Sequence, residues 1–317
     1  MFKKSLSVLS VTIVSAAILI PTISVQAKEK DPNVVFKSEK FGSTVVSFLN
    51  DGRIKGVPHP EKLSKEDRKK ILKQLNFKDK DIEEYPDDFE FVLLQEGGRK
   101  VEVTVGDYQH TVTHEDGTTE IINDSLVAST PTTEGLPKSN GEVNVLSMGT
   151  ASDGKWSGAG VLTYLGTTTT EYKYKYRTTF NWSSKPNYVY VDDIAISWND
   201  TSVPVGTSGY DYRRYEDGGY YSHTSRMSLT QVIPAGVSAE IDLASQEGNH
   251  YGYLEREVRI AKTRQGLTEV FGSAYGHSHL PSWMGGIGVS IGWASIDLSG
   301  TGDQWTWTST FTVGSTS

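Results

Sequence analysis

Apolar residues recur at helical spacing in one early stretch of the chain. Ser64 is a suitable N-cap for a helix that carries Ile71, Leu72 and Leu75 on one side. A short second helix through residue 85 and a third that ends at Gly97 follow the same logic. The pattern predicts a compact helical hairpin rather than a coiled coil, because the periodicity never lasts for three heptads.

Polar and apolar positions alternate in most of the remaining chain. Residues 100–105 read as a strand, and residues 108–122 read as a β-hairpin with a turn at 115–117. Further on, β-branched and aromatic segments are separated by Gly, Asn, Asp and Pro, as at 169–182, 188–198 and 304–313. These spacings predict short strands throughout the second half.

One stretch with neither a helical nor an alternating pattern interrupts the predicted strands. Residues 128–142 carry two Pro and two Gly without periodic apolar positions, which is typical of a linker. We therefore expect a mainly β protein: a small charged α+β domain at 28–127, followed by an all-β sandwich or jelly-roll-like domain at 143–317. All seven Trp lie in the second domain.

The first 27 residues have the features of a secretory signal peptide. Lys3 and Lys4 precede an apolar run, and Val25-Gln26-Ala27 places small residues three apart before Lys28. The run is shorter than the ~20 apolar residues of a membrane anchor. The sequence therefore predicts a secreted, extracellular protein with no transmembrane segment after cleavage.

Composition narrows the candidate partners. The chain has no Cys, which excludes disulfides and thiolate metal sites and is typical of Gram-positive exporters. Its formal net charge of −8, without a basic block, argues against a nucleic-acid partner.

A weak resemblance supports the same origin. Residues 172–198 contain the run Thr179-Phe180-Asn181-Trp182, then Pro186, and then the run Asp193-Ile-Ala-Ile-Ser-Trp198. This pattern resembles uncharacterised secreted proteins of Gram-positive bacteria. The resemblance implies secretion and a β domain, and it implies no activity and no functional residue.

Residues 210–221 are unusually rich in aromatic side chains. Rings with hydroxyl groups suit sugars or a lipid–water interface, although a hairpin whose tyrosines cover the sandwich would give the same pattern. The candidate ligand-binding residues are Tyr210, Tyr212, Arg213, Arg214, Tyr215, Tyr220 and Tyr221.

Two other groups could carry chemistry. His277 and His279 share one face of an extended segment and could supply two ligands to zinc. The carboxylates between 192 and 217 could serve glycoside hydrolysis or hold Ca²⁺. No loop fixes a metal by its spacing, so no cofactor is expected, and a structural calcium stays open as an alternative.

Residues 288–292 spell G-x-S-x-G around Ser290. No His follows His279, and the segment continues as strand where a hydrolase needs a helix. We assign no catalytic residue.

Three functions remain. The leading hypothesis is a secreted, non-enzymatic binding protein that contacts a cell-wall glycan, an exopolysaccharide or another surface. The second is a membrane-active or pore-forming toxin, because residues 285–293 alternate small and apolar side chains as a membrane-spanning strand does, although no partner strand is evident. The third is a secreted hydrolase that uses the carboxylates. The sequence leaves open the ligand, the oligomeric state, and whether the first domain is a propeptide or an adaptor.

Overall fold

The computed structural model describes residues 31–122, 150–151, 154–216, 219–222, 224–284 and 286–314. The predicted signal peptide and the predicted linker lie outside these ranges, so both stay predictions. No helix among the described residues is long and apolar enough to cross a membrane.

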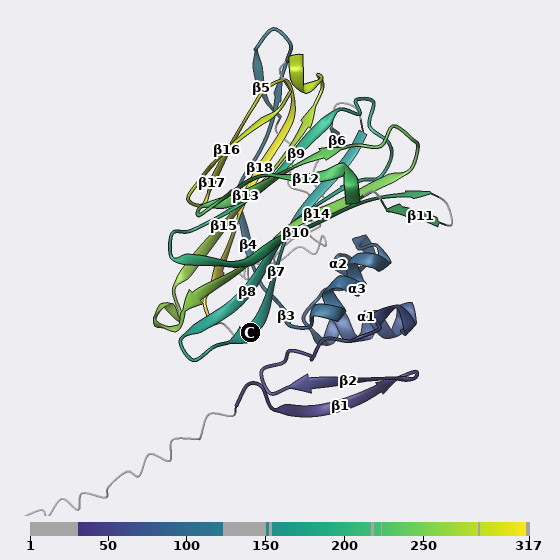
Figure 1. The fold of residues 1–317 in the computed structure, drawn as a ribbon, viewed down its shortest axis with the longest axis vertical. Coiled ribbons are helices and arrows are strands. Elements are labelled where there is room, and N and C mark those ends of the chain that lie inside the picture. The colour runs from purple at the N-terminus through teal and green to yellow at the C-terminus, as the bar shows by residue number, and fades with distance from the viewer. Residues whose placement is uncertain are drawn as a thin grey trace, which may run out of the picture. The chain divides into compact units, whose positions relative to one another are not determined.

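The described part of the chain opens with a hairpin that the sequence analysis did not predict, followed by the helical group that the periodicity predicts (Figure 1). Ser64 Oγ accepts a hydrogen bond from the Asp67 N–H at 3.1 Å and caps the first helix. The elements are β1 (Val35–Phe41), β2 (Thr44–Leu49), the 3₁₀ turn η1 (Pro60–Lys62), α1 (Lys65–Gln74), α2 (Asp79–Glu84) and α3 (Asp87–Glu96).

Two antiparallel sheets form most of the remaining structure. The first, which we call the helix-side sheet, has the strand order β11-β10-β14-β8-β7-β3, with β6 paired to β7. Its strands are β3 (Arg99–Val101), β6 (Thr150–Ala151), β7 (Gly154–Thr167), β8 (Glu171–Trp182), β10 (Ser202–Glu216), β11 (Gly219–Ser222) and β14 (Asn249–Ala261).

The second, which we call the hairpin-side sheet, has the order β12-β13-β9-β15-β18-β4-β5. Its strands are β4 (Thr104–Thr113), β5 (Thr119–Ile122), β9 (Val191–Trp198), β12 (Met227–Ile233), β13 (Gly236–Asp242), β15 (Thr268–Ser278) and β18 (Gly302–Thr312). The 3₁₀ turns η2 (Thr224–Arg226), η3 (Lys262–Arg264) and η4 (Ser282–Met284) lie between strands. This arrangement confirms the predicted mainly β, sandwich-like fold.

An aromatic core joins the two sheets. Each strand turns alternate side chains inward, so the β-branched and aromatic runs meet between the layers. Trp182, Trp305 and Tyr176 are fully buried there, and Trp156 stacks on Trp305 with ring centroids 4.2 Å apart.

The helical group covers the other face of the helix-side sheet. Phe89 of α3 packs on Tyr251 and Tyr253 of β14, with ring centroids 5.6 and 5.3 Å apart. Arg177 of β8, which is fully buried, bonds Glu96 at the end of α3 and Glu255 of β14. Helices and sheet therefore share a second core.

This sharing corrects the predicted division of the chain at residue 127. β3 pairs with β7, and β4 pairs with β18, so strands from before residue 127 belong to the same sheets as strands from after residue 143. From Pro32 onward the chain forms one compact unit. Local periodicity identifies each strand, but it does not encode the distant strand with which it pairs.

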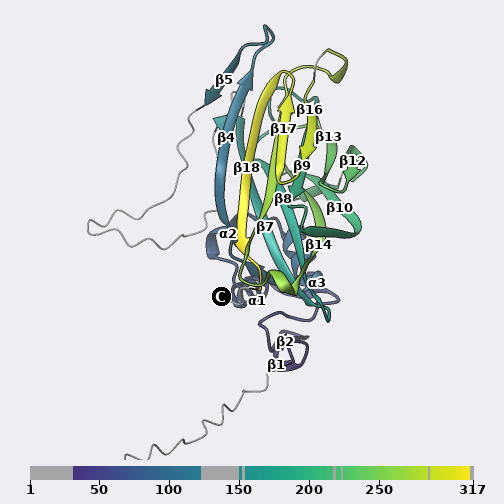
Figure 2. The same cartoon turned by 90° about the vertical axis from the view of Figure 1, so that its left-hand side faces the viewer.

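A short hairpin lies on the outer face of the hairpin-side sheet (Figure 2). This outer hairpin consists of β16 (Gly288–Gly292) and β17 (Ser295–Ser299), which pair only with each other among the described residues. The Ala294 N–H at its tip donates to the Trp198 carbonyl at 2.9 Å, and Gln231 Nε2 donates to the Val289 carbonyl at 2.9 Å. Both ends are thus fixed to the sheet.

Candidate functional site

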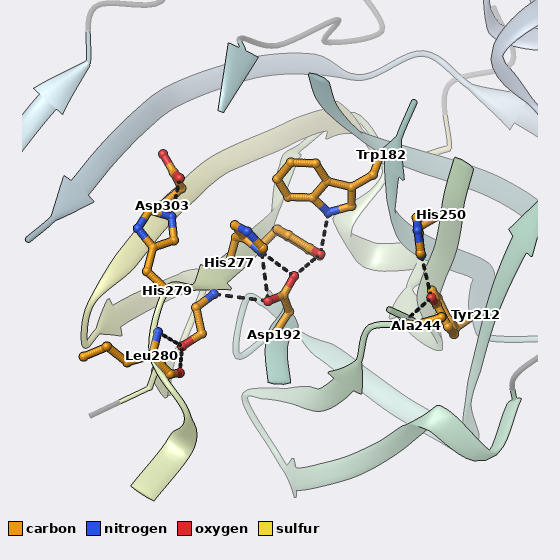
Figure 3. Close-up of polar contacts among 11 residues, drawn as sticks. Trp182, Asp192, Tyr212, Ala244, His250, His277, His279, Leu280 and Asp303 are labelled. Carbon is orange, nitrogen blue, oxygen red and sulfur yellow. Dashed lines mark hydrogen bonds and ion pairs between the residues drawn. The ribbon is translucent and has the colours of Figure 1, made fainter. Parts of the chain in front are cut away.

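The tyrosine-rich segment 210–221 runs along β10 and into β11. Alternation along β10 sends Tyr212 into the core between the sheets, where it is 0% exposed. Its hydroxyl accepts a hydrogen bond from the Ala244 N–H at 2.9 Å and lies 2.7 Å from His250 Nδ1 (Figure 3). Burial raises the pKa of Tyr212 to about 12. The prediction of Tyr212 as a ligand contact is wrong, because strand alternation buries it.

The opposite face of β10 turns toward helix α3. Arg213 forms ion pairs with Asp88 and with Asp211, the latter at 2.7 Å, and the Tyr215 hydroxyl lies 3.4 Å from Asp88 Oδ2. Burial and the neighbouring Asp88 raise the pKa of Tyr215 well above its usual range. These side chains join the helix to the sheet.

The rest of the segment is divided between core and surface. Tyr210 is half-buried against the aromatic core. Arg214 is buried, bonds Glu216 at 2.6 Å and the Glu247 carbonyl, and lies 4.5 Å from the ring centroid of Tyr221. Tyr221 is 48% exposed, and the side chain of Tyr220 lies outside the described residues.

The two histidines of the predicted metal site, His277 and His279, are hydrogen-bonded to different aspartates. His277 is fully buried, with Nδ1 2.9 Å from Asp192 Oδ2 (Figure 3). The Tyr275 hydroxyl and the Ser278 N–H donate to the same carboxylate at 2.5 and 3.1 Å. This closed network satisfies the buried Asp192, so we interpret it as structural.

His279 belongs to a different network near the surface. Its Nε2 lies 2.9 Å from Asp303 Oδ2, and the buried His110 lies 3.0 Å from the other oxygen. Burial alone would raise the pKa of Asp303, but the hydrogen bonds from His110 and His279 outweigh it and hold that pKa well below its usual range. The half-exposed Tyr188 stacks on His279, with ring centroids 4.4 Å apart.

Neither network offers the ligand set of a metal. Among the described residues, no three His, Cys, Asp or Glu side chains are grouped so that they could hold one. His277 and His279 are each held by a different aspartate, which explains why two imidazoles at zinc-like spacing do not converge.

Three of the candidate carboxylates for hydrolysis face in different directions. Asp192 faces the core, its neighbour Asp193 faces the outer hairpin, and Asp211 faces helix α3. Ser290 of the G-x-S-x-G motif is exposed on β16, within a strand. These three carboxylates therefore lie on different faces and form no pair that could flank one glycosidic bond, while Asp217 lies outside the described residues.

A groove that the sequence analysis did not anticipate lies beside the outer hairpin. It encloses about 430 Å³, within the range of ligand-binding clefts, between β17 and the outer face of β4, β5 and β18. Residues 296–300 form one wall. Its floor and far side carry uncharged polar side chains: Gln109, Thr111, Thr113, Thr119, Gln304 and Thr306.

The outer hairpin beside this groove is amphipathic. The half-buried apolar residues lie on one face: Val289, Ile291, Ile296 and Leu298. Ser290 and Asp297, which lie between them on β16 and β17, are exposed. The only sequence signal for the groove is the Thr and Gln alternation along β4 and β18. Alternation of this kind is common on any solvated sheet face, so it could not single out a site.

Comparisons with known proteins add little. No protein-family model and no curated protein matches this chain. A collagen-binding domain from a Staphylococcus aureus adhesin matches with a TM-score of 0.22 at 10% identity, covering 41% of this chain and 86% of the domain. The Clostridium perfringens NetB toxin in its membrane-inserted form matches with a TM-score of 0.27 at 8% identity, covering 52% and 93%.

Proposed function

We propose that this chain is a secreted, non-enzymatic binding protein that contacts a cell-wall glycan, an exopolysaccharide or another extracellular surface through the groove beside β17. The groove carries the proposal, because it is a ligand-sized hollow lined mainly by uncharged polar side chains. The tyrosine segment no longer supports it, since Tyr212 belongs to the core.

Retention of the mature protein on isolated peptidoglycan, wall polysaccharide and intact cells tests the proposal. Thr306→Arg places a long side chain in the groove. Thr310→Arg is its control, on the same face of β18 but outside the groove. We expect Thr306→Arg to abolish retention and Thr310→Arg to preserve it. Equal retention of both variants, or no retention of the wild type, would contradict the proposal.

A membrane-active function is the second candidate, because the structure supplies the partner strand that the sequence did not reveal. β17 pairs with β16, and the apolar residues of both strands share one face. A transmembrane strand needs about 9–11 residues, whereas these strands have five each as folded. Insertion would therefore require the hairpin to leave the sheet and extend.

A reversible tether tests this requirement. A Cβ on Gly276 would lie 3.3 Å from the Ile287 Cβ, close to disulfide geometry, and the chain has no other cysteine. If the chain has this second function, the wild-type protein releases dye from phosphatidylcholine–phosphatidylglycerol liposomes. The oxidised double variant Gly276→Cys/Ile287→Cys should be silent until it is reduced. Silence of the wild type at high concentration would remove this candidate.

A further inference from the structure

The wall of the groove is a strand with one unpaired edge. Among the described residues β17 pairs only with β16, and Gly292 and Ser295 close the two-residue loop between them. A pair that closes such a loop exchanges hydrogen bonds, and the bonding alternates along an antiparallel ladder. Ser295, Asp297 and Ser299 therefore bond β16, while the N–H and C=O groups of Ile296 and Leu298 point toward the groove.

We propose that the groove receives an extended polypeptide segment that adds to β17 as an antiparallel strand. The inference rests on the proposed function, since it takes the groove as the contact site, and among the extracellular surfaces named there it selects a protein. Strand addition to an exposed edge is a general mode of peptide recognition, in which backbone hydrogen bonds give affinity and alternate side chains give specificity.

The floor of the groove gives this edge a second contact surface. A strand beside β17 lies over Thr111 and Thr306, so every second side chain points down onto hydroxyl groups. The edge strand β12 of the hairpin-side sheet differs from β17, because the register of β12 with β13 shifts between Leu229 and Gln231. Such bulges protect an edge from pairing, and β16–β17 pairing shows no shift.

The side chains around the groove define what the peptide should carry. The floor is uncharged, which suits small hydroxyl-bearing or β-branched residues pointing down. Asp297 is exposed on the upper side of β17, and the chain carries 39 acidic against 31 basic residues. Basic residues should therefore alternate with small ones. No aromatic ring lines the groove, so the stacking surface typical of sugar sites is missing.

A designed probe tests the pairing directly. The acetylated and amidated heptapeptide Thr-Lys-Thr-Lys-Thr-Lys-Thr follows the predicted alternation. In an antiparallel pair, a residue opposite Ile296 shares its side-chain direction and turns its own N–H toward β17. The threonines of the probe should therefore donate the hydrogen bonds. N-methylation of its two inner threonines should weaken binding about tenfold, and N-methylation of two lysines should not.

Amide hydrogen exchange of the full mature protein provides the matching readout. With saturating probe, we expect the N–H groups of Ile296 and Leu298 to exchange at least about tenfold more slowly. Asp297, already bonded to β16, should not change. Thr306→Arg should remove the protection, and Thr310→Arg should keep it.

The outcomes separate this inference from the proposed function. Equal binding of the two N-methylated peptides, or protection at Asp297 instead of its neighbours, would overturn strand addition. Retention on wall glycan that depends on the groove, without any peptide binding, would overturn the inference and leave the proposed function intact. If the protein neither binds the peptide nor is retained on the wall, the inference and the proposed function are both wrong.

Discussion

The tyrosine segment of β10 and the groove beside β17 use their polar groups in opposite ways. In the tyrosine segment, polar atoms are paired inside the protein: Tyr212 with His250, Arg213 with Asp88. Along the groove, Ile296 and Leu298 turn backbone groups outward over a floor of hydroxyls and amides. The many aromatic residues of the tyrosine segment therefore indicated packing inside the protein. The surface suited to a ligand consists mainly of Thr, Gln and Ser residues, which are common on any solvated strand.

The largest expected effect comes from Arg213→Ala. It leaves Asp88 and Asp211, which are mostly buried, without their cation. We expect the free energy of unfolding to fall by about 2–3 kcal/mol in urea denaturation, with peptide binding at the groove unchanged. A loss of binding without a loss of stability would make the tyrosine segment a ligand site after all.

Tyr212→Phe should destabilise the protein by about 1–2 kcal/mol. It removes only the hydroxyl and leaves the Ala244 N–H and His250 without that partner in the core. Thermal unfolding followed by near-UV circular dichroism measures the change. An unchanged melting temperature would contradict the role assigned to this hydroxyl.

Asp193, on the sheet face that carries the outer hairpin, makes the stability of the protein depend on pH. Burial, with Glu240 and Asp192 nearby, raises the pKa of Asp193 to about 8. The unfolded carboxyl titrates near 3.8, so ionisation of Asp193 destabilises the folded state increasingly from about pH 4 to pH 8. Asp193→Asn should therefore stabilise the protein by at least about 1 kcal/mol at pH 9 and have no effect near pH 3.5. A gain that is constant across this range would contradict the raised pKa.

Tyr221→Ala should have the smallest effect. The ring is 48% exposed, and its contact with Arg214 is worth about 0.5 kcal/mol. We expect a near wild-type urea midpoint and unchanged retention on cell-wall preparations. If retention is lost, the exposed end of the tyrosine segment contributes to the binding surface.

Local sequence predicted the elements well. The Ser64 cap, the apolar spacing of α1, and the alternation of β8, β9 and β18 each depend on residues close together in the chain. The outer hairpin was only half predicted. Residues 288–298 were read as one continuing strand, so the strand character of β16 and β17 was recognised, but the turn at Trp293-Ala294 that folds them against each other was missed.

The sequence by itself determined which segments become helix or strand and which positions along each share a face, because period and capping are local properties. Only the tertiary structure decided that β4 joins β18, that Tyr212 faces inward, and that one edge of β17 borders a hollow. Each of these depends on partners far along the chain. A side chain is core or surface according to what covers it, and a strand edge is free or paired according to which strands reach it.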